Sequence, residues 1–268
     1  MRTNNRGITG HMVVKNEDRF VYFAISSVLP YLDQLLITDT GSTDNTIKII
    51  ESIKSDKISL TRVHVNNPAE VTAVRQSQLE ATKTPWFWLI DGDEIYPQKT
   101  AEEVVNATQH NFAIIAVRRY DLLGDIYHAQ KESVGTYELY GQRGHLVTRL
   151  FNRDKLPGLN LAGDYPNEGY YLGDQRSTLD IPRDNVYVTS NKLFHAMYLQ
   201  RSSLRNDLAM FNRNKYKIEL GQPIASGIPE VFGKYPTDVT DPNTRRGLSY
   251  ELLASLITPI KNLKRALT

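Results

Sequence analysis

Two groups of acidic residues directly follow apolar segments that are typical of buried strands. Asp39 comes after the run at 35–38, and the sequence DGDE at 91–94 comes after the run WFWLI at 86–90. Carboxylates buried there without partners would cost free energy. A divalent cation removes that cost, and carboxylate oxygens suit Mg²⁺ or Mn²⁺. The competing interpretation is a simple turn at the strand end, because Asp-Gly is a common turn dipeptide.

The segments around these acids predict an α/β domain with a largely parallel central sheet. Strand-like and helix-like segments alternate through roughly the first 120 residues, which is the pattern of such domains. In open α/β sheets, ligands bind at the carboxyl edge of the strands. We therefore expect Asp39 and the motif at 91–94 to lie at one edge. The expected strands cover residues 8–14, 35–38, 58–65, 86–90 and 112–117.

Three motifs follow one another in a recognisable order: KNE at 15–17, DTGSTDNT at 39–46 and DGDE at 91–94. Together they resemble the N-terminal half of the family 2 glycosyltransferases. The stretch 12–46 is similar to the branch that includes lipopolysaccharide-core β-glucosyltransferases. The resemblance is dense over 8–96 and becomes sparse towards residue 215. It implies a GT-A fold with a mixed, mostly parallel sheet, and an inverting, metal-dependent enzyme that moves a sugar from a nucleotide-sugar to a hydroxyl group.

The resemblance also implies roles for residues on the donor side. Asp39 would hold the uracil or ribose of a UDP-sugar, with a turn or helix-capping residue as the alternative. Asp91 would face the ribose or the sugar, and Asp93 would bind the Mn²⁺ or Mg²⁺ ion that bridges the two phosphates. Lys15 and Glu17 would line the nucleotide pocket. Their alternatives are an exposed lysine and a glutamate in the first turn of a helix.

On the acceptor side, the resemblance assigns the general base to a loop after a strand that contains RLF at 149–151. The loop corresponds to YPNEG at 165–169, in which Asn167 replaces the histidine of the family motif. Glu168 is the expected base, which would take a proton from the acceptor hydroxyl. Asp164 is the alternative base, and a solvated loop acid is the alternative role of Glu168.

His195, in KLFHAMY, ends a further predicted strand at 186–194. The resemblance implies a third metal ligand or a hydrogen-bond donor to the β-phosphate there. A hydrogen-bonded core histidine is the alternative. The next segment, 202–220, is predicted to be a helix. Arg201, Arg205 and Lys215 are expected on a solvated basic face, and steering of a polyanionic donor is the alternative.

Composition narrows the classes of function. The 268 residues include 32 Lys and Arg against 30 Asp and Glu, and the net charge of +2 argues against a large DNA-binding surface. The absence of cysteine excludes disulfides, thiol nucleophiles and cysteine-ligated zinc. The longest charge-free apolar stretch, 21–32, is too short to span a bilayer, and the N-terminus lacks an apolar signal core. We therefore expect a cytoplasmic protein.

Two other functions are alternatives at this point. A sugar-phosphate nucleotidyltransferase needs a glycine-rich, basic loop after its first strand, and residues 8–17 contain none. A non-catalytic protein that binds a nucleotide-sugar is favoured by Asn167 and disfavoured by Asp39 and the DGD sequence. For a transferase, we expect a glycan acceptor, with a protein side chain or a modified nucleic-acid base as alternatives.

The chain is predicted to divide into a GT-A domain at 1–220 and a C-terminal arm at 221–268. The arm ends in a helix with an apolar stripe at every fourth position, which Pro259 is expected to interrupt. We expect the stripe to pack on the catalytic domain or on a second copy of the chain, giving a homodimer. Peripheral attachment to an anionic membrane is the alternative, for which three cations are few. The stripe is Leu248, Leu252, Leu256 and Ile260, and the cations are Lys261, Lys264 and Arg265.

Overall fold

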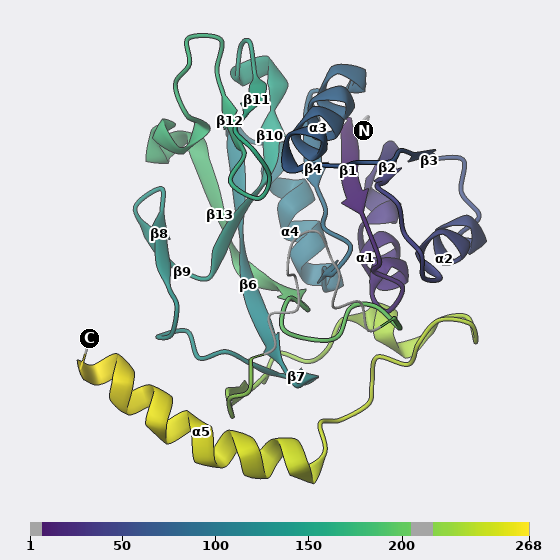
Figure 1. Ribbon diagram of the computed structural model, residues 1–268. Coiled ribbons are helices and arrows are strands. Elements are labelled where there is room, and N and C mark those ends of the chain that lie inside the picture. Colours follow the sequence, from purple (N-terminus) through teal and green to yellow (C-terminus); the bar gives the residue numbers. More distant parts are fainter. Residues whose placement is uncertain (1–6, 205–216, 268) are drawn as a thin grey trace.

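The computed structural model describes residues 7–204 and 217–267. Within these ranges, a ten-stranded mixed sheet forms the centre of the molecule (Figure 1). The main strand order is β14-β7-β6-β10-β4-β1-β2-β3, and β13 pairs with both β5 and β6. The strands are β1 (Ile8–Val14), β2 (Gln34–Asp39), β3 (Ile58–Arg62), β4 (Trp86–Leu89), β5 (Glu94–Ile95), β6 (Ile114–Leu123), β7 (Asp125–Ala129), β10 (Leu146–Asn152), β13 (Val186–His195) and β14 (Gln222–Pro223).

The first half of the sheet, β3-β2-β1-β4, is parallel, as the alternating sequence pattern predicts. In the register of β1 and β2, Val14 is opposite Asp39. In that of β1 and β4, His11 is opposite Leu89. The acids after β2 and β4 therefore lie at the same carboxyl edge. The α/β architecture with a mixed sheet and a C-terminal helix is confirmed.

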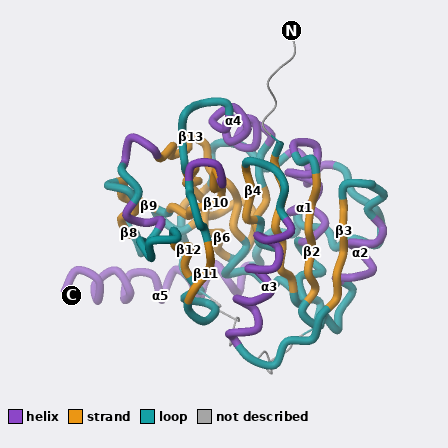
Figure 2. Tube along the Cα trace, turned by 90° about the horizontal axis from the view of Figure 1, so that it is seen from above, coloured by secondary structure: helices purple, strands orange, loops and turns teal. Residues whose placement is uncertain are grey.

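Helices cover both faces of the sheet. Figure 2 shows α4 and α3 on opposite sides of the strands. Two short strand pairs, β8–β9 and β11–β12, lie outside the main sheet. The helices are α1 (Val21–Val28), α2 (Thr46–Ser52), α3 (Pro68–Ala81), α4 (Gln98–Thr108) and α5 (Leu248–Leu267). The outlying strands are β8 (Tyr137–Leu139), β9 (Gln142–Gly144), β11 (Asn160–Ala162) and β12 (Gly169–Tyr171).

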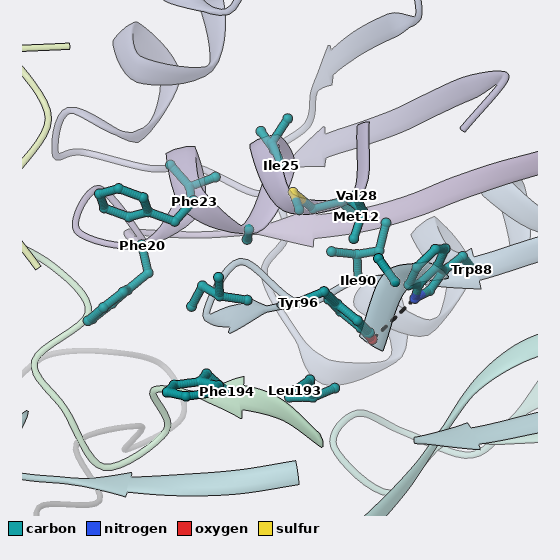
Figure 3. Packing of buried hydrophobic residues seen from close by; sticks show 14 of the residues in the cluster. Met12, Phe20, Phe23, Ile25, Val28, Trp88, Ile90, Tyr96, Leu193 and Phe194 are labelled. Atoms are coloured by element: carbon teal, nitrogen blue, oxygen red, sulfur yellow. Dashed lines mark hydrogen bonds between the residues drawn. The ribbon is translucent and has the colours of Figure 1, made fainter. Parts of the chain in front are cut away.

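The strand WFWL at the centre of the sheet is buried at every position, because a strand covered on both faces needs an unbroken apolar run. On one face, Trp88 belongs to the apolar cluster that also includes residues of α1, and its indole Nε1 donates a hydrogen bond to Tyr96 Oη at 3.1 Å (Figure 3). On the other face, Phe87 stacks on Phe151, with ring centroids 5.1 Å apart. This rigid strand fixes the start of the DGDE motif.

The C-terminal arm is attached to the rest of the molecule by a strand and by aromatic packing. β14 pairs antiparallel with β7, and the buried Phe232 packs against Phe23 with centroids 5.0 Å apart. The stripe of α5 does not pack on the rest of the chain, so that expectation is wrong: Leu252 and Leu256 are 67% and 69% exposed. Pro259 lies inside the helix and does not end it.

One expected helix is not seen where the structure describes its residues. The helix expected at 202–220 lies largely outside the described residues, and its described ends, 202–204 and 217–220, are not helical. Among the described helices, none is long and apolar enough to cross a membrane.

Candidate active site

The loops that follow β1 and β2 are tied together at the carboxyl edge of the sheet. Asn16 has a left-handed backbone (φ 54°), and its side-chain oxygen accepts a hydrogen bond from the Thr43 N–H at 2.8 Å. The N–H of Asn16 donates to Ser42 Oγ at 2.9 Å, and that of Glu17 donates to Thr46 Oγ1 at 2.8 Å. The motifs at 15–17 and 39–46 therefore form one structural unit.

Asp39 organises the turn after β2. The side chain is buried, and its Oδ2 accepts hydrogen bonds from the N–H groups of Gly41 and Ser42, both at 3.0 Å. Gly41 has φ 101°, which L side chains rarely adopt. A Cβ on Gly41 would lie 3.9 Å from Lys15 Nζ, so Lys15 lies beside this turn. Carboxylate oxygens can accept further hydrogen bonds, and the nucleotide contacts of Asp39 and Lys15 stay predictions.

The loop after β4 packs directly against the loop after β1. A Cβ on Gly92 would lie 3.1 Å from Cβ and Cγ of Glu17 and 3.3 Å from Val14 Cγ1. Glycine at position 92 therefore allows this close approach. Glu17 is only 3% exposed, and its predicted place in the nucleotide pocket stays a prediction.

Asp93 and His195, the two predicted metal ligands, are brought together by the pairing of β13 with β5. In this pairing His195 is opposite Glu94, and the N–H of Ala196 donates to the Asp93 carbonyl oxygen at 2.9 Å. As a result, His195 Nε2 lies 3.6 Å from Asp93 Oδ2. Both side chains are buried.

This pair of donors fits a hard divalent cation that also binds phosphate. Two ligands of an octahedral ion with bonds of about 2.1 Å lie about 3 Å apart, close to the separation seen here. Mg²⁺ is usually bound through one or two carboxylates and substrate phosphates, and Asp93 offers one such carboxylate. Among the described residues, no group of three or more His, Cys, Asp or Glu side chains is arranged to hold a metal. A bound ion would therefore need further ligands from a diphosphate and water.

A buried aspartate on β6 orients the imidazole of His195. Asp121 Oδ1 lies 3.2 Å from His195 Nδ1 and 2.9 Å from Arg119 Nε, and its Oδ2 lies 3.6 Å from His145 Nδ1. Burial alone would raise the pKa of Asp121, but the hydrogen bond with His195 and the charge of Arg119 lower it below its usual value. A carboxylate behind the ring is the usual support of a metal-binding histidine.

Arg201 lies between two buried carboxylates and not on a solvated face, so that expectation is wrong for this residue. Its Nη1 is 3.0 Å from Glu17 Oε1 and 3.2 Å from Asp93 Oδ2. Burial lowers the pKa of Arg201, but the charges of Glu17 and Asp93 outweigh burial and raise it above its usual value. The other two expected cations, Arg205 and Lys215, lie outside the described residues.

Two arginines hold the acids of the DGDE motif, and one of them, Arg75, also reaches the loop that carries the predicted base. Arg149 Nη2 lies 2.6 Å from Asp91 Oδ2 and 2.5 Å from Glu94 Oε1. Arg75, on α3, places Nη2 3.4 Å from Asp91 Oδ1 and Nε 3.1 Å from Glu168 Oε1. The Asp91 side chain remains 32% exposed, which leaves it open to a ligand. Asp91 and Glu168 are therefore held by one shared guanidinium group.

Asp164, the alternative base, lies on the exposed part of the same loop. Its carbonyl oxygen accepts a hydrogen bond from the N–H of Asn167 at 2.8 Å, and both residues are exposed. Within the described part of the chain, the Asp164 carboxylate has no ion pair or hydrogen bond. Glu168, by contrast, forms an ion pair with Arg75, and its catalytic role stays a prediction.

The sequence analysis assigned no role to Arg75 or to Arg149, which begins the RLF motif, although each carries a local signal. Arg75 lies four residues from both Val71 and Leu79 and so falls on the buried stripe of α3. Arg149 lies in the apolar strand β10, in which every residue from 149 to 152 is buried. A cation on a stripe that otherwise faces the core predicts a buried acidic partner, but does not say which one.

Glu94 is completely buried and depends on Arg149. Burial raises the pKa of Glu94 above its usual value, and the adjacent Arg149 opposes that rise. Since removal of one partner leaves the other charge uncompensated, we expect Arg149→Met to lower the free energy of unfolding by about 3 kcal/mol. Urea denaturation followed by circular dichroism measures this change.

Arg62→Met is the matched control, because Arg62 forms an exposed ion pair with Glu51 on the surface. We expect that substitution to cost less than about 1 kcal/mol. Adding Glu94→Gln to Arg149→Met should recover part of the loss, because it removes the uncompensated charge. Equal losses in Arg149→Met and Arg62→Met would contradict the importance of the buried pair.

The sequence of this chain matches a known protein family over the range that contains the motifs of the site. The model of the family described as "Glycosyl transferase family 2" matches residues 11–159, a range that includes Asp39, Asp91 and Asp93. The search of curated proteins found no match.

Several solved structures match parts of this chain. Glucosyl-3-phosphoglycerate synthase from Mycobacterium tuberculosis, in complex with Mn²⁺ and UDP-glucose, is 23% identical over 42% of this chain and 43% of that enzyme, with a TM-score of 0.34. Its complex with Mn²⁺, UDP and glucosyl-3-phosphoglycerate is 17% identical over 71% of this chain and 72% of the other, with a TM-score of 0.48. Residues 1–349 of S. aureus TarS are 12% identical over 71% and 60% of the two chains, with a TM-score of 0.44. In the first match, this chain covers less than half of the enzyme.

Proposed function

Because this chain belongs to glycosyltransferase family 2, and so is a glycosyltransferase that uses a nucleotide-sugar, we propose that it transfers the sugar of a UDP-sugar to a hydroxyl group of a glycan. We further propose inversion at the anomeric carbon and dependence on Mn²⁺ or Mg²⁺. The M. tuberculosis enzyme binds Mn²⁺ and UDP-glucose, which supports the choice of metal and nucleotide. A lipopolysaccharide-core acceptor, suggested by the sequence at 12–46, is the most specific form of the proposal.

The observation that carries the proposal is the juxtaposition of Asp93 and His195 at the carboxyl edge of the sheet. Their donor atoms are 3.6 Å apart, and the partly exposed Asp91 lies two residues before Asp93. In our proposal Asp93 and His195 hold the cation against the diphosphate, and Asp91 contacts the ribose or the sugar. The cation neutralises the negative charge that develops on the leaving diphosphate. Asp121 keeps the imidazole of His195 in the orientation that this contact requires.

Glu168 completes the proposed site as the general base. The acceptor oxygen attacks the anomeric carbon in line with the bond to the diphosphate, and its proton passes to the Glu168 carboxylate. The carbon–oxygen bond to the diphosphate breaks, which releases UDP and inverts the anomeric configuration. Arg75 contacts both Asp91 and Glu168, so it positions the base relative to the donor side of the site.

A thermal-shift screen of nucleotide-sugars with Mn²⁺ tests this proposal. At about 100 times its dissociation constant, a ligand stabilises the folded state by about 2.7 kcal/mol, which raises the melting temperature of a chain of this length by about 5–10 °C. We expect that shift with UDP-sugars and Mn²⁺, but not with GDP-sugars or in excess chelator. Stabilisation by UDP-sugars that is equal with and without the metal would contradict the proposed metal site. Mass spectrometry of glycan acceptors incubated with the stabilising donor would then identify the product.

A further inference from the structure

A cavity of about 440 Å³ lies between strand β7 and the C-terminal arm. The Arg246 N–H joins the two by donating a hydrogen bond to Asp125 Oδ2 at 3.2 Å, and Figure 1 shows β7 in the lower part of the molecule. Small-molecule sites typically occupy about 300–1,000 Å³, so this cavity has room for a ligand larger than a free phosphate ion. Its described walls come from residues 19–20, 124–126, 198–200, 217–218 and 240–250.

Arg19 is the side chain in this cavity that most clearly lacks a partner. Within the described part of the chain, its guanidinium has no hydrogen bond and no ion pair, and its Nε is buried without an acceptor. Buried polar groups in folded proteins are nearly always hydrogen-bonded, and a charged donor left without a partner costs more free energy than a neutral one. Arg19 therefore indicates a ligand that brings an anionic acceptor into the cavity.

Two further cations line the cavity and are only partly compensated. Lys217 Nζ donates a hydrogen bond to Gln130 Oε1 and lies 3.8 Å from Glu219 Oε1. Glu219 is closer to Arg265, at 2.7 Å, so it cannot fully neutralise Lys217. Burial lowers the pKa of Lys217 below its usual value, and the charge of Glu219 offsets only part of that effect. Arg245 is exposed and forms no ion pair with a described residue.

The two acidic residues of the cavity wall are engaged by their own surroundings. Asp125 is buried, and its Oδ1 accepts a hydrogen bond from the Tyr127 N–H at 2.9 Å, while its Oδ2 accepts the bond from Arg246. Asp241 Oδ1 accepts a hydrogen bond from the Tyr235 hydroxyl at 2.7 Å. Neither carboxylate forms an ion pair with the three cations. The positive charge of the cavity is therefore left for a ligand.

The cavity borders the proposed metal site. The Arg19 N–H donates a hydrogen bond to the Arg201 carbonyl oxygen at 3.1 Å, and Arg201 Nη1 lies 3.2 Å from Asp93 Oδ2. In the strand order, β7 lies on one side of β4, and β2, which ends at Asp39, lies on the other. The DGDE motif after β4 therefore separates the cavity from the proposed nucleotide contact of Asp39.

We propose that this cavity binds an anionic group, a phosphate or a carboxylate, carried by the acceptor glycan, and that Arg19 and Lys217 are its ligands. The planar guanidinium of arginine matches both groups, because it can donate two parallel hydrogen bonds. The assignment to the acceptor rests on the proposed function, whereas the binding of the anionic sugar does not. The charged group would then select among acceptors, because a neutral glycan leaves Arg19 unpaired.

Isothermal titration calorimetry with the full chain tests this site without nucleotide or metal. The probes are glucose 6-phosphate and glucuronate, with glucose and inorganic phosphate as references. We expect the wild-type protein to bind the two anionic sugars more tightly than either reference. Arg19→Met should lower the affinity for glucose 6-phosphate by about 10-fold or more, and Lys217→Met is the second variant.

Arg62→Met is the matched control, because it makes the same change on β3, at the other end of the strand order, and it should bind like the wild type. Arg19→Met keeps an apolar side chain and loses no contact within the described chain, so its melting temperature should not fall. Equal affinity of the wild type, Arg19→Met and Lys217→Met for glucose 6-phosphate would overturn the proposal. Inorganic phosphate that binds as tightly as glucose 6-phosphate would overturn the assignment to a sugar.

The outcome for this cavity is separable from that for the donor site. If neither anionic sugar binds while UDP-sugars and Mn²⁺ still stabilise the protein, the cavity proposal is wrong and the proposed function stands. If glucose 6-phosphate binds through Arg19 but no UDP-sugar stabilises the protein, the anion site stands and its assignment to an acceptor falls with the proposed function.

Discussion

Replacement of Asp93 by asparagine should lower donor turnover by about 10³-fold or more and should abolish the Mn²⁺-dependent stabilisation by UDP. Asp93 is the carboxylate that lies 3.6 Å from His195, and asparagine keeps its size but not its charge. Without that charge the cation is held less tightly, and the diphosphate leaves without compensation for its developing charge. Turnover assays and thermal shift with UDP and Mn²⁺ measure the two effects.

Two controls separate this effect from structural damage. Asp56→Asn alters an exposed aspartate in the loop between α2 and β3, at the opposite edge of the sheet, and should leave turnover unchanged. Glu17→Gln removes the other carboxylate partner of Arg201 but keeps Asp93, so the Mn²⁺ dependence should survive. Full activity of Asp93→Asn, or of the wild-type protein in excess chelator, would contradict the role of the metal.

Glu168→Gln should lower turnover by about 10²- to 10⁴-fold, while the binding of UDP and Mn²⁺ stays near that of the wild type. Glutamine keeps an oxygen for Arg75, whose Nε is 3.1 Å from Glu168 Oε1, but it cannot take a proton from the acceptor. The loss should therefore appear in kcat and not in donor affinity. Steady-state kinetics and thermal shift with UDP distinguish the two.

Asp164→Asn is the matched variant, because it makes the same chemical change in the exposed part of the same loop. We expect turnover within a few-fold of the wild type. If Asp164→Asn is inactive and Glu168→Gln is not, the base is Asp164.

Much of the fold could be predicted from the sequence because its signals are local. The apolar runs at 8–14, 35–38 and 86–90 are short and follow one another with helices between them, and such units make parallel strands. Once the strands are parallel, residues that follow them must share one edge. The positions of Asp39 and of the DGDE motif therefore followed from chain order and periodicity, whereas the family followed from the resemblance of the three motifs.

The partners of these acids could not be predicted, since they come from distant parts of the chain. Arg149 is 58 residues from Asp91, and Arg201 is 108 residues from Asp93. Periodicity placed Arg149 in a strand but gave no register between that strand and β4. For Arg201, the sequence suggested a solvated face, whereas the end of β13 carries it to a buried gap between two carboxylates. Coulombic pairing depends on distance in space, which only the tertiary structure decides.

Helix α5 also has one feature that the sequence determines and one that only the tertiary structure decides. Spacing of three and four residues determines which side chains share a face of a helix, so the apolar stripe was evident from the sequence alone. The helix continues through Pro259, which was expected to interrupt the stripe. The spacing does not determine what that face meets. The tertiary structure decided this through Thr258, Tyr250 and Glu219, whose hydrogen bonds and ion pairs hold the polar face on the body. Because those contacts occupy one side of α5, the leucines must face outward.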